Sequence, residues 1–281
     1  MKLRIAALLL FVAATGYLTT RGWDVDPFDF SILLIAGLLA SGGASAINHY
    51  IDRDLDSAMD RTRGRPLPQH RIEPPSRALA FGLVLEVIAL SAAAILVNVL
   101  TAAMILLGLV VYVGVYTLGL KRTHASNIVI GGLAGSCPAL AGSAAAIDAI
   151  SLPAVLIGVL VFLWTPGHFW ALAYRLRDDY RRVGIPMLPA VRDEGTSVRA
   201  IAVSTGLVPL STFAFFLAPT FHNGLYLTIC AAAAAALFVV TARFVRRPAP
   251  DTALSGYRFS GTYLAAILGA MIASAIWFAP G

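Results

Sequence analysis

The sequence predicts an all-α, polytopic membrane protein, a single domain over residues 1–281, on three observations. Of its 281 residues 58% are hydrophobic and 13% are charged, whereas soluble domains carry about 25% charged residues. Nine apolar stretches approach the roughly 20 residues that a helix needs to cross a bilayer. Basic residues are almost confined to every second segment between these stretches. We place the spans near residues 5–20, 30–50, 78–97, 100–119, 126–147, 152–173, 199–218, 223–242 and 260–279.

The first stretch, residues 5–20, is the shortest and has a rival interpretation. It follows Lys2 and Arg4, as the apolar region of a secretory signal peptide follows basic residues. No small-residue cleavage site follows cleanly, and the run from Tyr17 to Arg21 is typical of a helix end. We therefore interpret this stretch as a membrane span.

Later spans contain residues that predict helix packing, a buried charge and a kink. The second span ends in the small residues 42–46, which permit close helix contact. The third contains Glu86 near mid-membrane, where an ionisable group is a candidate functional residue. A protonated or hydrogen-bonded carboxyl is the favoured interpretation, because nothing basic lies at matching depth. Pro166 and Gly167 predict a kink or break in the sixth span.

The basic residues predict the topology. One set of segments between the spans holds 20 of the 21 Lys and Arg residues, and the other set holds only Arg21. By the positive-inside rule the basic segments face the cytoplasm of a prokaryotic-type cell, in its inner membrane. The N-terminus is then inside and the C-terminus outside. The net charge of +6 therefore indicates membrane topology and predicts no nucleic-acid partner.

An acidic row follows the second span. Asn48, Asp52, Asp56 and Asp60 recur every four residues, a spacing that stacks side chains on one helix face. Stacked carboxylates repel one another unless cations lie among them. Carboxylate oxygens with a substrate phosphate are typical of a Mg²⁺ site. The alternative is a solvated helix end held by salt bridges.

A second acidic and basic cluster, residues 175–189, follows the sixth span. Both clusters end in a Pro-rich turn and four spans separate them. We therefore expect two four-helix halves of like orientation plus a ninth helix, with both clusters meeting at one cavity. Carboxylates there would hold metal, and Arg side chains would bind phosphate oxygens. An apolar cavity below suits an enzyme that ionises an allylic isoprenyl diphosphate away from water.

At this point the sequence resembles a known family. Asn48-x3-Asp52-x3-Asp56 is similar to the first signature of the UbiA-type intramembrane prenyltransferases. Within them, four runs resemble the protohaem IX farnesyltransferase (haem O synthase) subfamily, and the likeness covers roughly residues 5–275. These runs are residues 52–66, 127–132, 164–173 and 178–189.

The resemblance implies transfer of the farnesyl group of farnesyl diphosphate to a vinyl carbon of haem b. Haem O and diphosphate are the implied products, on the route to the haem A of terminal oxidases. The implied cofactor is Mg²⁺; membrane lipid and a downstream haem A synthase are implied partners. Asn48, Asp52, Asp56 and Asp178 are the implied metal ligands, with Asp179 beside Asp178. The remaining implied substrate contacts are Arg53, Arg65, Lys121, Arg122, Arg175, Tyr180 and Arg182.

The sequence departs from the wider superfamily at the second motif. Many relatives carry a full Asp-x3-Asp there, but Tyr174 and Arg175 stand four residues before Asp178 and Asp179. That form agrees with the haem subfamily and argues against a second complete metal site.

His168 and the aromatic residues around it have two interpretations each. His168 is a haem contact or a proton carrier, or a histidine bonded to a carbonyl that Pro166 frees. Trp164 and Trp170 line the cavity and stabilise a cation, or anchor the helix at the interface.

Two other functions remain open at this stage. One is a prenyltransferase acting on an aromatic quinone precursor or a chlorin. The other is a membrane transporter, whose sites usually lie at the midplane on broken helices; the charges here lie at loop level.

Overall fold

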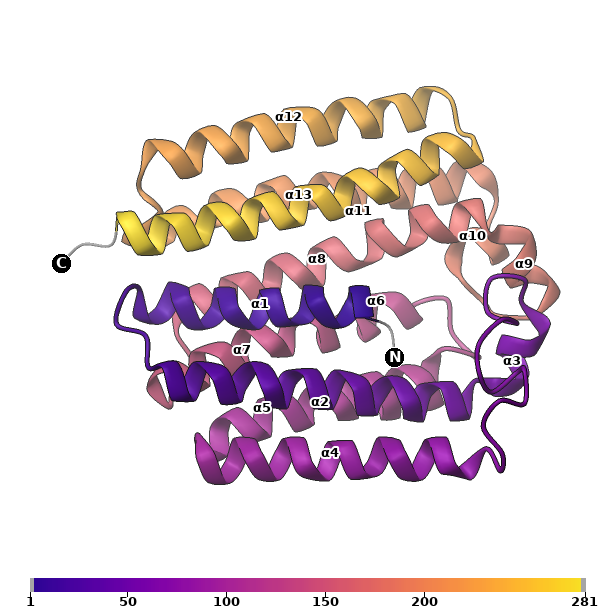
Figure 1. Ribbon diagram of the computed structural model, residues 1–281. Coiled ribbons are helices and arrows are strands. Elements are labelled where there is room, and N and C mark those ends of the chain that lie inside the picture. The colour runs from indigo at the N-terminus through magenta and orange to yellow at the C-terminus, as the bar shows by residue number, and fades with distance from the viewer. Residues whose placement is uncertain (1–2, 279–281) are drawn as a thin grey trace.

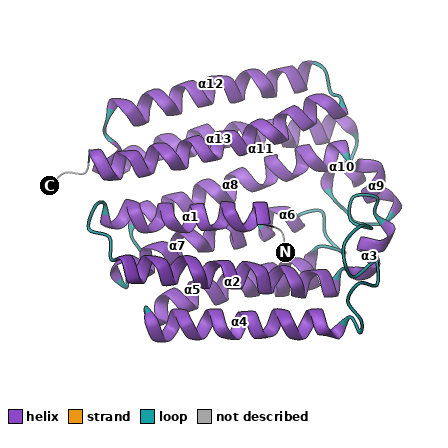
Figure 2. Cartoon of the chain, in the orientation of Figure 1, coloured by secondary structure: helices purple, strands orange, loops and turns teal. Residues whose placement is uncertain are grey.

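The computed structural model describes residues 3–278, and within that range its regular elements are all helices joined by loops (Figure 2). The predicted all-α fold is confirmed. Lys2 and residues 279–281, on which part of the topology prediction rests, lie outside the described residues. The helices are α1 (Leu3–Arg21), α2 (Pro27–Ile51), α3 (Arg53–Ala58), α4 (Ser76–Leu96), α5 (Val99–Leu109), α6 (Asn127–Gly131), α7 (Leu133–Ile147), α8 (Leu152–Arg175), α9 (Arg177–Arg182), α10 (Leu188–Val191), α11 (Glu194–Phe213), α12 (Gly224–Arg246) and α13 (Pro250–Trp277), with a π-helix η1 (Val110–Leu120) and two 3₁₀ turns, η2 (Ala214–Leu217) and η3 (Pro219–Phe221).

The long helices lie side by side in one bundle (Figure 1). Among the described residues, eight segments are long and apolar enough to cross a membrane. The 19-residue α1 packs beside them against α2, α7 and α13. The protein is therefore an integral membrane protein, and the predicted count of nine spans is approximate, because eight segments meet this criterion and α1, the predicted first span, is not one of them.

The helices begin where the sequence supplies caps. The Asp26 carboxylate accepts hydrogen bonds from the backbone N–H groups of Phe28 and Asp29, and Pro27 opens α2. Ser151 caps α8 in the same way at the N–H of Ala154. Such caps satisfy the N–H groups that a helix start leaves without partners.

Small residues bring α2 and α4 into backbone contact, as the run 42–46 predicted. A Cβ on Gly43 would lie 2.7 Å from the Gly82 carbonyl oxygen, and a Cβ on Gly82 would lie 2.9 Å from that of Gly43. The contact lies just over one helical turn before Asn48, so it fixes the part of α2 that leads into the acidic row.

Three elements differ from the sequence prediction. The last span begins at Pro250, ten residues before the predicted start, because its first turns are polar and only the later ones resemble a membrane helix. The sixth span does not break at Pro166 but continues as one helix, Leu152–Arg175; a proline is tolerated inside membrane helices, and the alternative of a kink stays a prediction. The fourth span changes from α-helix to the π-helix η1 at Val110, for which the sequence pattern gave no signal.

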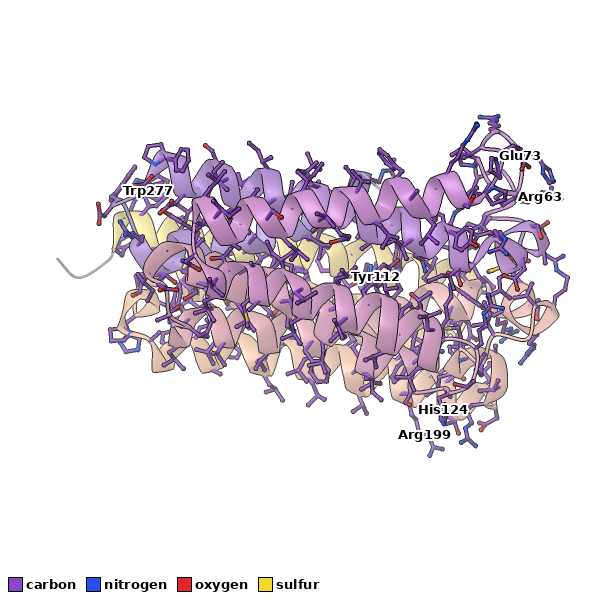
Figure 3. All side chains as sticks on the ribbon, turned by 90° about the horizontal axis from the view of Figure 1, so that it is seen from below. Arg63, Glu73, Tyr112, His124, Arg199 and Trp277 are labelled. Carbon is purple, nitrogen blue, oxygen red and sulfur yellow. The ribbon has the colours of Figure 1, made fainter. Side chains whose placement is uncertain are left out.

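The charged segments gather at one end of the bundle. Figure 1 shows α3, α9 and α10 at the same end, although helices α4 to α8 lie between α3 and α9 in the chain. Figure 3 shows Arg63, Glu73, His124 and Arg199 near that end and Trp277 at the opposite one. The predicted meeting of the two acidic clusters on one face of the bundle is thus found, and we call this end the charged end.

Candidate active site

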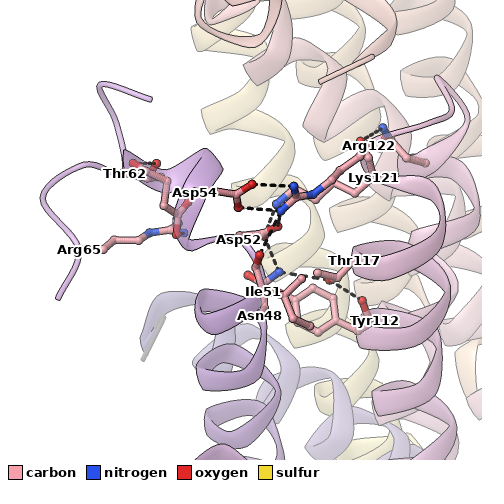
Figure 4. A network of polar contacts seen from close by, with 12 residues as sticks. Asn48, Ile51, Asp52, Asp54, Thr62, Arg65, Tyr112, Thr117, Lys121 and Arg122 are labelled. Atoms are coloured by element: carbon pink, nitrogen blue, oxygen red, sulfur yellow. Dashed lines mark hydrogen bonds and ion pairs between the residues drawn. The ribbon is translucent and has the colours of Figure 1, made fainter. Parts of the chain in front are cut away.

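The end of α2 presents two side chains of the acidic row to the π-helix η1 (Figure 4). The Asn48 amide Nδ2 donates to Asp52 Oδ2 at 2.7 Å and to the Thr117 hydroxyl at 3.2 Å. Thr117 in turn donates to the Tyr112 carbonyl oxygen at 2.8 Å. The wider turn of a π-helix is frequent at functional sites, and here it carries Thr117 to the acidic row.

Asp52 is fully buried, with 0% of its surface exposed. Its Oδ2 also accepts a hydrogen bond from the Lys121 ammonium group. Its Oδ1 has no hydrogen-bond partner among the described residues, and the Arg122 guanidinium lies 3.9 Å from it. Burying an ionised carboxylate is costly unless cations or donors surround it, so this oxygen is well suited to a further cation.

Asp56 lies one turn further on and is also buried. Its Oδ2 accepts from the Arg65 guanidinium at 2.6 Å, and the Thr62 hydroxyl donates to its backbone carbonyl at 3.0 Å. The two buried carboxylates therefore each hold one basic side chain, Lys121 or Arg65.

Asp54, between them, faces outward and holds Arg122. Both guanidinium nitrogens lie 2.8 Å from Asp54 oxygens. This bidentate contact keeps the pKa of Asp54 below its ordinary value. Arg122 is thus held at the surface by Asp54.

A cavity of about 410 Å³ extends from the acidic row into the bundle. This volume lies within the usual range of ligand pockets. Its mouth is polar and is lined by Asn48, Asp56, Arg61, Arg65, Lys121 and Tyr180. Its depth is apolar and is lined by residues such as Leu8, Val12, Leu33, Met104, Ile105 and Ala141. One wall is aromatic and contains Trp164, His168, Phe169 and Tyr257.

The second cluster reaches the same mouth through two contacts. Arg182 lies 3.0 Å from Asp60, and Arg61 donates to the Tyr180 hydroxyl at 3.5 Å. Arg182 holds the pKa of Asp60 below its usual value, and burial raises the pKa of Tyr180. The two acidic segments therefore meet at the charged end.

Several predicted site residues lie away from the cavity wall. Asp178 is exposed, with 87% of its side chain accessible, and pairs with Arg181 at 3.3 Å. Leu176, Tyr180 and Val183 pack inward, so Asp178 faces outward on α9. A role for Asp178 as a metal ligand stays a prediction that this arrangement does not favour.

Other predicted site residues outside the cavity wall, Asp52, Arg122 and Arg182 among them, also have partners or packing of their own. Arg53 lies over the Tyr50 ring, and Arg175 pairs with Asp251 at 2.8 Å. Asp179 is hydrogen-bonded by Arg182. Trp170 packs with residues of α11, α12 and α13. Their predicted roles in metal, phosphate or substrate binding likewise stay predictions.

Glu86 lines the cavity from α4. It is 3% exposed, and neither carboxyl oxygen has a hydrogen-bond partner among the described residues. The protonated or hydrogen-bonded carboxyl that the sequence favoured for Glu86 therefore stays a prediction.

Sequence reasoning missed some residues of the site. Thr117 became visible only with η1, and Tyr257 and Ser260 were placed in a loop or at a span's start. Arg61 lies in the run 52–66 that resembles the family, but the sequence predicted no role for it. Groups of three His, Cys, Asp or Glu side chains arranged for a metal are absent from residues 3–278, so a cation here needs oxygens from Asn48 or from a substrate.

The fold and site define an intramembrane prenyltransferase: residues 9–263 match the UbiA prenyltransferase family. The chain belongs to that family. It is 41% identical to protoheme IX farnesyltransferase 1 of Cenarchaeum symbiosum, covering 99% of this chain and 95% of that one. It is 40% identical to the protoheme IX farnesyltransferase of Sulfolobus acidocaldarius, covering 98% and 94%.

Solved structures show the same fold at low sequence identity. A digeranylgeranylglyceryl phosphate synthase matches with a TM-score of 0.79 and 18% identity, covering 98% of this chain and 99% of that one. A UbiA homologue from Aeropyrum pernix K1 matches at 0.74 and 20%, covering 98% of each. One from Archaeoglobus fulgidus, bound to DMAPP and Mg²⁺, matches at 0.69 and 14%, covering 96% and 97%.

Proposed function

We propose that this protein transfers the farnesyl group of farnesyl diphosphate to a vinyl group of haem b and that one water adds to the resulting carbocation, giving haem O and diphosphate. The observation that carries the proposal is one cavity with a charged mouth and an apolar depth. Relatives about 40% identical over nearly the whole chain are protoheme IX farnesyltransferases, which supports the choice of acceptor.

The mouth binds the diphosphate through its basic side chains. Lys121 and Arg65 line the cavity and each contacts a buried carboxylate. Arg61 lines it as well. When a diphosphate enters, these side chains donate some of their hydrogen bonds to its oxygens, because guanidinium and ammonium groups bind phosphate strongly.

The donor set at the mouth fits Mg²⁺. Asp52 and Asp56 are buried carboxylates, one Asp52 oxygen is unpartnered, and Asn48 lies beside them. Asn48, Asp52 and Asp56 would hold the ion, which when bound neutralises charge on the departing diphosphate. Hard oxygen ligands shared with substrate phosphate are what this ion prefers.

The depth of the cavity receives the prenyl chain and excludes water. Leu8, Val12, Leu33 and Met104 offer only apolar surface, so a farnesyl cation formed at the mouth meets the haem vinyl group before water. The ring faces of Trp164 and Phe169 stabilise positive charge by cation–π attraction.

The distribution of basic residues supports an orientation. The positive-inside rule predicts that the charged end faces the cytoplasm. In a prokaryotic-type inner membrane, the mouth of the cavity then opens toward farnesyl diphosphate in the cytoplasm. The N-terminus is then inside and the C-terminus outside. The product remains in the membrane, where a haem A synthase is the proposed downstream partner.

The test uses the purified protein in lipid nanodiscs with haem b, farnesyl diphosphate and Mg²⁺. Mass spectrometry should detect haem O and released diphosphate, and EDTA should abolish both. A parallel reaction with 4-hydroxybenzoate measures acceptor choice. Prenylation of 4-hydroxybenzoate without haem O would reject the proposed acceptor, and turnover unaffected by EDTA would reject the metal.

A further inference from the structure

The aromatic wall of the cavity contains an imidazole whose tautomer is fixed by its neighbours. His168 Nδ1 lies 2.7 Å from the Ser260 hydroxyl oxygen. That hydroxyl donates to the Tyr257 carbonyl oxygen at 2.9 Å. A hydroxyl has one proton and a carbonyl can only accept, so both contacts of the Ser260 hydroxyl are satisfied when its oxygen accepts from His168. In that arrangement the proton of the neutral ring is on Nδ1, and Nε2 carries a lone pair.

The ring is also fixed in orientation. It is stacked on Trp164 at 4.0 Å between ring centroids and lies 4.3 Å from the Tyr257 ring on α13. The Trp164 indole N–H donates to the Ser260 backbone carbonyl at 2.8 Å. Rotation of the imidazole would break its hydrogen bond and separate these rings. Ser260 thus holds both members of the stack.

The Nε2 edge of His168 is available to a ligand. His168 lines the cavity together with Trp164 and Tyr257. Among the described residues its side-chain hydrogen bond to Ser260 is made at Nδ1, and Nε2 does not belong to the buried polar atoms that lack a partner. A histidine with Nδ1–H on an oxygen and an open Nε2 is the arrangement of most metal-binding histidines.

We propose that His168 Nε2 coordinates the iron of the haem acceptor and that Ser260 is its positioning residue. This inference rests on the proposed function, which brings haem b into the cavity. An axial ligand stands perpendicular to the haem plane, so coordination fixes the plane and depth of the acceptor. The remaining cavity walls then select which edge, and hence which vinyl group, turns toward the mouth.

The experiment measures haem binding without turnover. Full-length protein in nanodiscs is titrated with haem b in the absence of farnesyl diphosphate, and absorption and resonance Raman spectra are recorded. The variants are His168→Ala, Ser260→Ala and Ser260→Thr. His124→Ala, which removes an exposed histidine at the charged end, is the matched control.

We expect the wild type to show an iron–histidine stretching band in the ferrous state. His168→Ala should lose it, and added imidazole should restore a nitrogen-ligated spectrum. Ser260→Ala should keep the band at lower frequency, because Nδ1–H loses its acceptor and the ligand becomes less basic, with haem affinity falling about tenfold. Ser260→Thr and His124→Ala should resemble the wild type.

A spectrum that is the same in His168→Ala and the wild type overturns the inference, as does a wild type that shows no iron–histidine band. A purely structural role for Ser260 would leave the band frequency unchanged and would overturn the positioning role. Haem O formation is measured separately. A wild type that ligates haem through His168 but makes no haem O counts against the proposed function, not against the ligand.

Discussion

Arg182, on the short helix α9, lies 3.0 Å from Asp60, in the loop after α3 and 122 residues earlier in the chain. Arg61, next to Asp60, donates to Tyr180 on the same helix α9. These contacts connect the two acidic segments above the cavity. The mouth is therefore assembled from both segments, and its geometry depends on this connection.

The Asp60–Arg182 pair predicts a pH-dependent contribution to stability. Arg182 lowers the folded-state pKa of Asp60, and the unfolded value is about 3.9. The pair's contribution should be complete above that value and disappear as the pH falls through the lower folded-state pKa. The difference in thermal stability between wild type and Asp60→Asn should be constant from about pH 8 to pH 5 and vanish in acid. A difference that persists unchanged at about pH 2 would contradict the pairing.

Asp56→Asn should remove most of the activity while keeping the fold. The amide is nearly isosteric, so packing is preserved, but it cannot neutralise Arg65 or bind a cation as a carboxylate does. We expect haem O formation to fall about 10²-fold or more, the usual size of a lost electrostatic contact at a reacting centre. Initial rates and a thermal melt are measured together. Asp24→Asn, at an exposed site remote from the mouth, is the control, and an Asp56→Asn rate equal to it would exclude Asp56 from the site.

Gly43→Ala should destabilise the bundle. The added Cβ would lie 2.7 Å from the Gly82 carbonyl oxygen and 2.8 Å from a Glu86 carboxyl oxygen, so α2 and α4 must separate. Overpacking of this kind costs about 1–3 kcal/mol. Gly206→Ala, whose Cβ would meet nothing within 4 Å, should keep or raise the melting temperature. Equal melting temperatures for the two variants would show that α2 and α4 do not touch at Gly43.

A larger side chain at Ala141 should shorten the preferred prenyl donor. Ala141 lies on α7 and lines the apolar depth of the cavity. A leucine there takes up volume that the end of a farnesyl chain needs, and hydrophobic pockets discriminate by about 1–3 kcal/mol per methylene. The ratio of kcat/KM for farnesyl to geranyl diphosphate should fall about tenfold or more. An unchanged ratio would show that the chain does not reach α7.

Hydrophobicity and charge placement were sufficient to predict the fold class and the membrane spans. Helices in lipid must be long, apolar and flanked by charge, and this pattern is read directly from a sequence. The boundary of α13 was wrong because its first turns are polar yet helical. The π-helix η1 was missed because a change in hydrogen-bond register leaves no trace in composition.

The first half of the site followed from the four-residue spacing of Asn48, Asp52 and Asp56. The second half did not, because packing against the rest of the protein sets which face of a short helix points inward, and the sequence pattern does not determine that face. The inward positions are Leu176, which caps α9, and Tyr180 on α9, so Asp178 faces outward. Ser260 and His168 are in contact although they lie 92 positions apart in the chain. The residue types alone do not predict such a contact.

The central claim is that the buried carboxylates and their cations form the mouth of a farnesyl transfer site for haem b. The most direct test is mass spectrometry of haems from cells expressing the wild type or Asp56→Asn at equal membrane levels, in a strain without its own activity. The account predicts haem O with the wild type and little or none with the variant. Haem O at equal levels in both, or in neither, would contradict it.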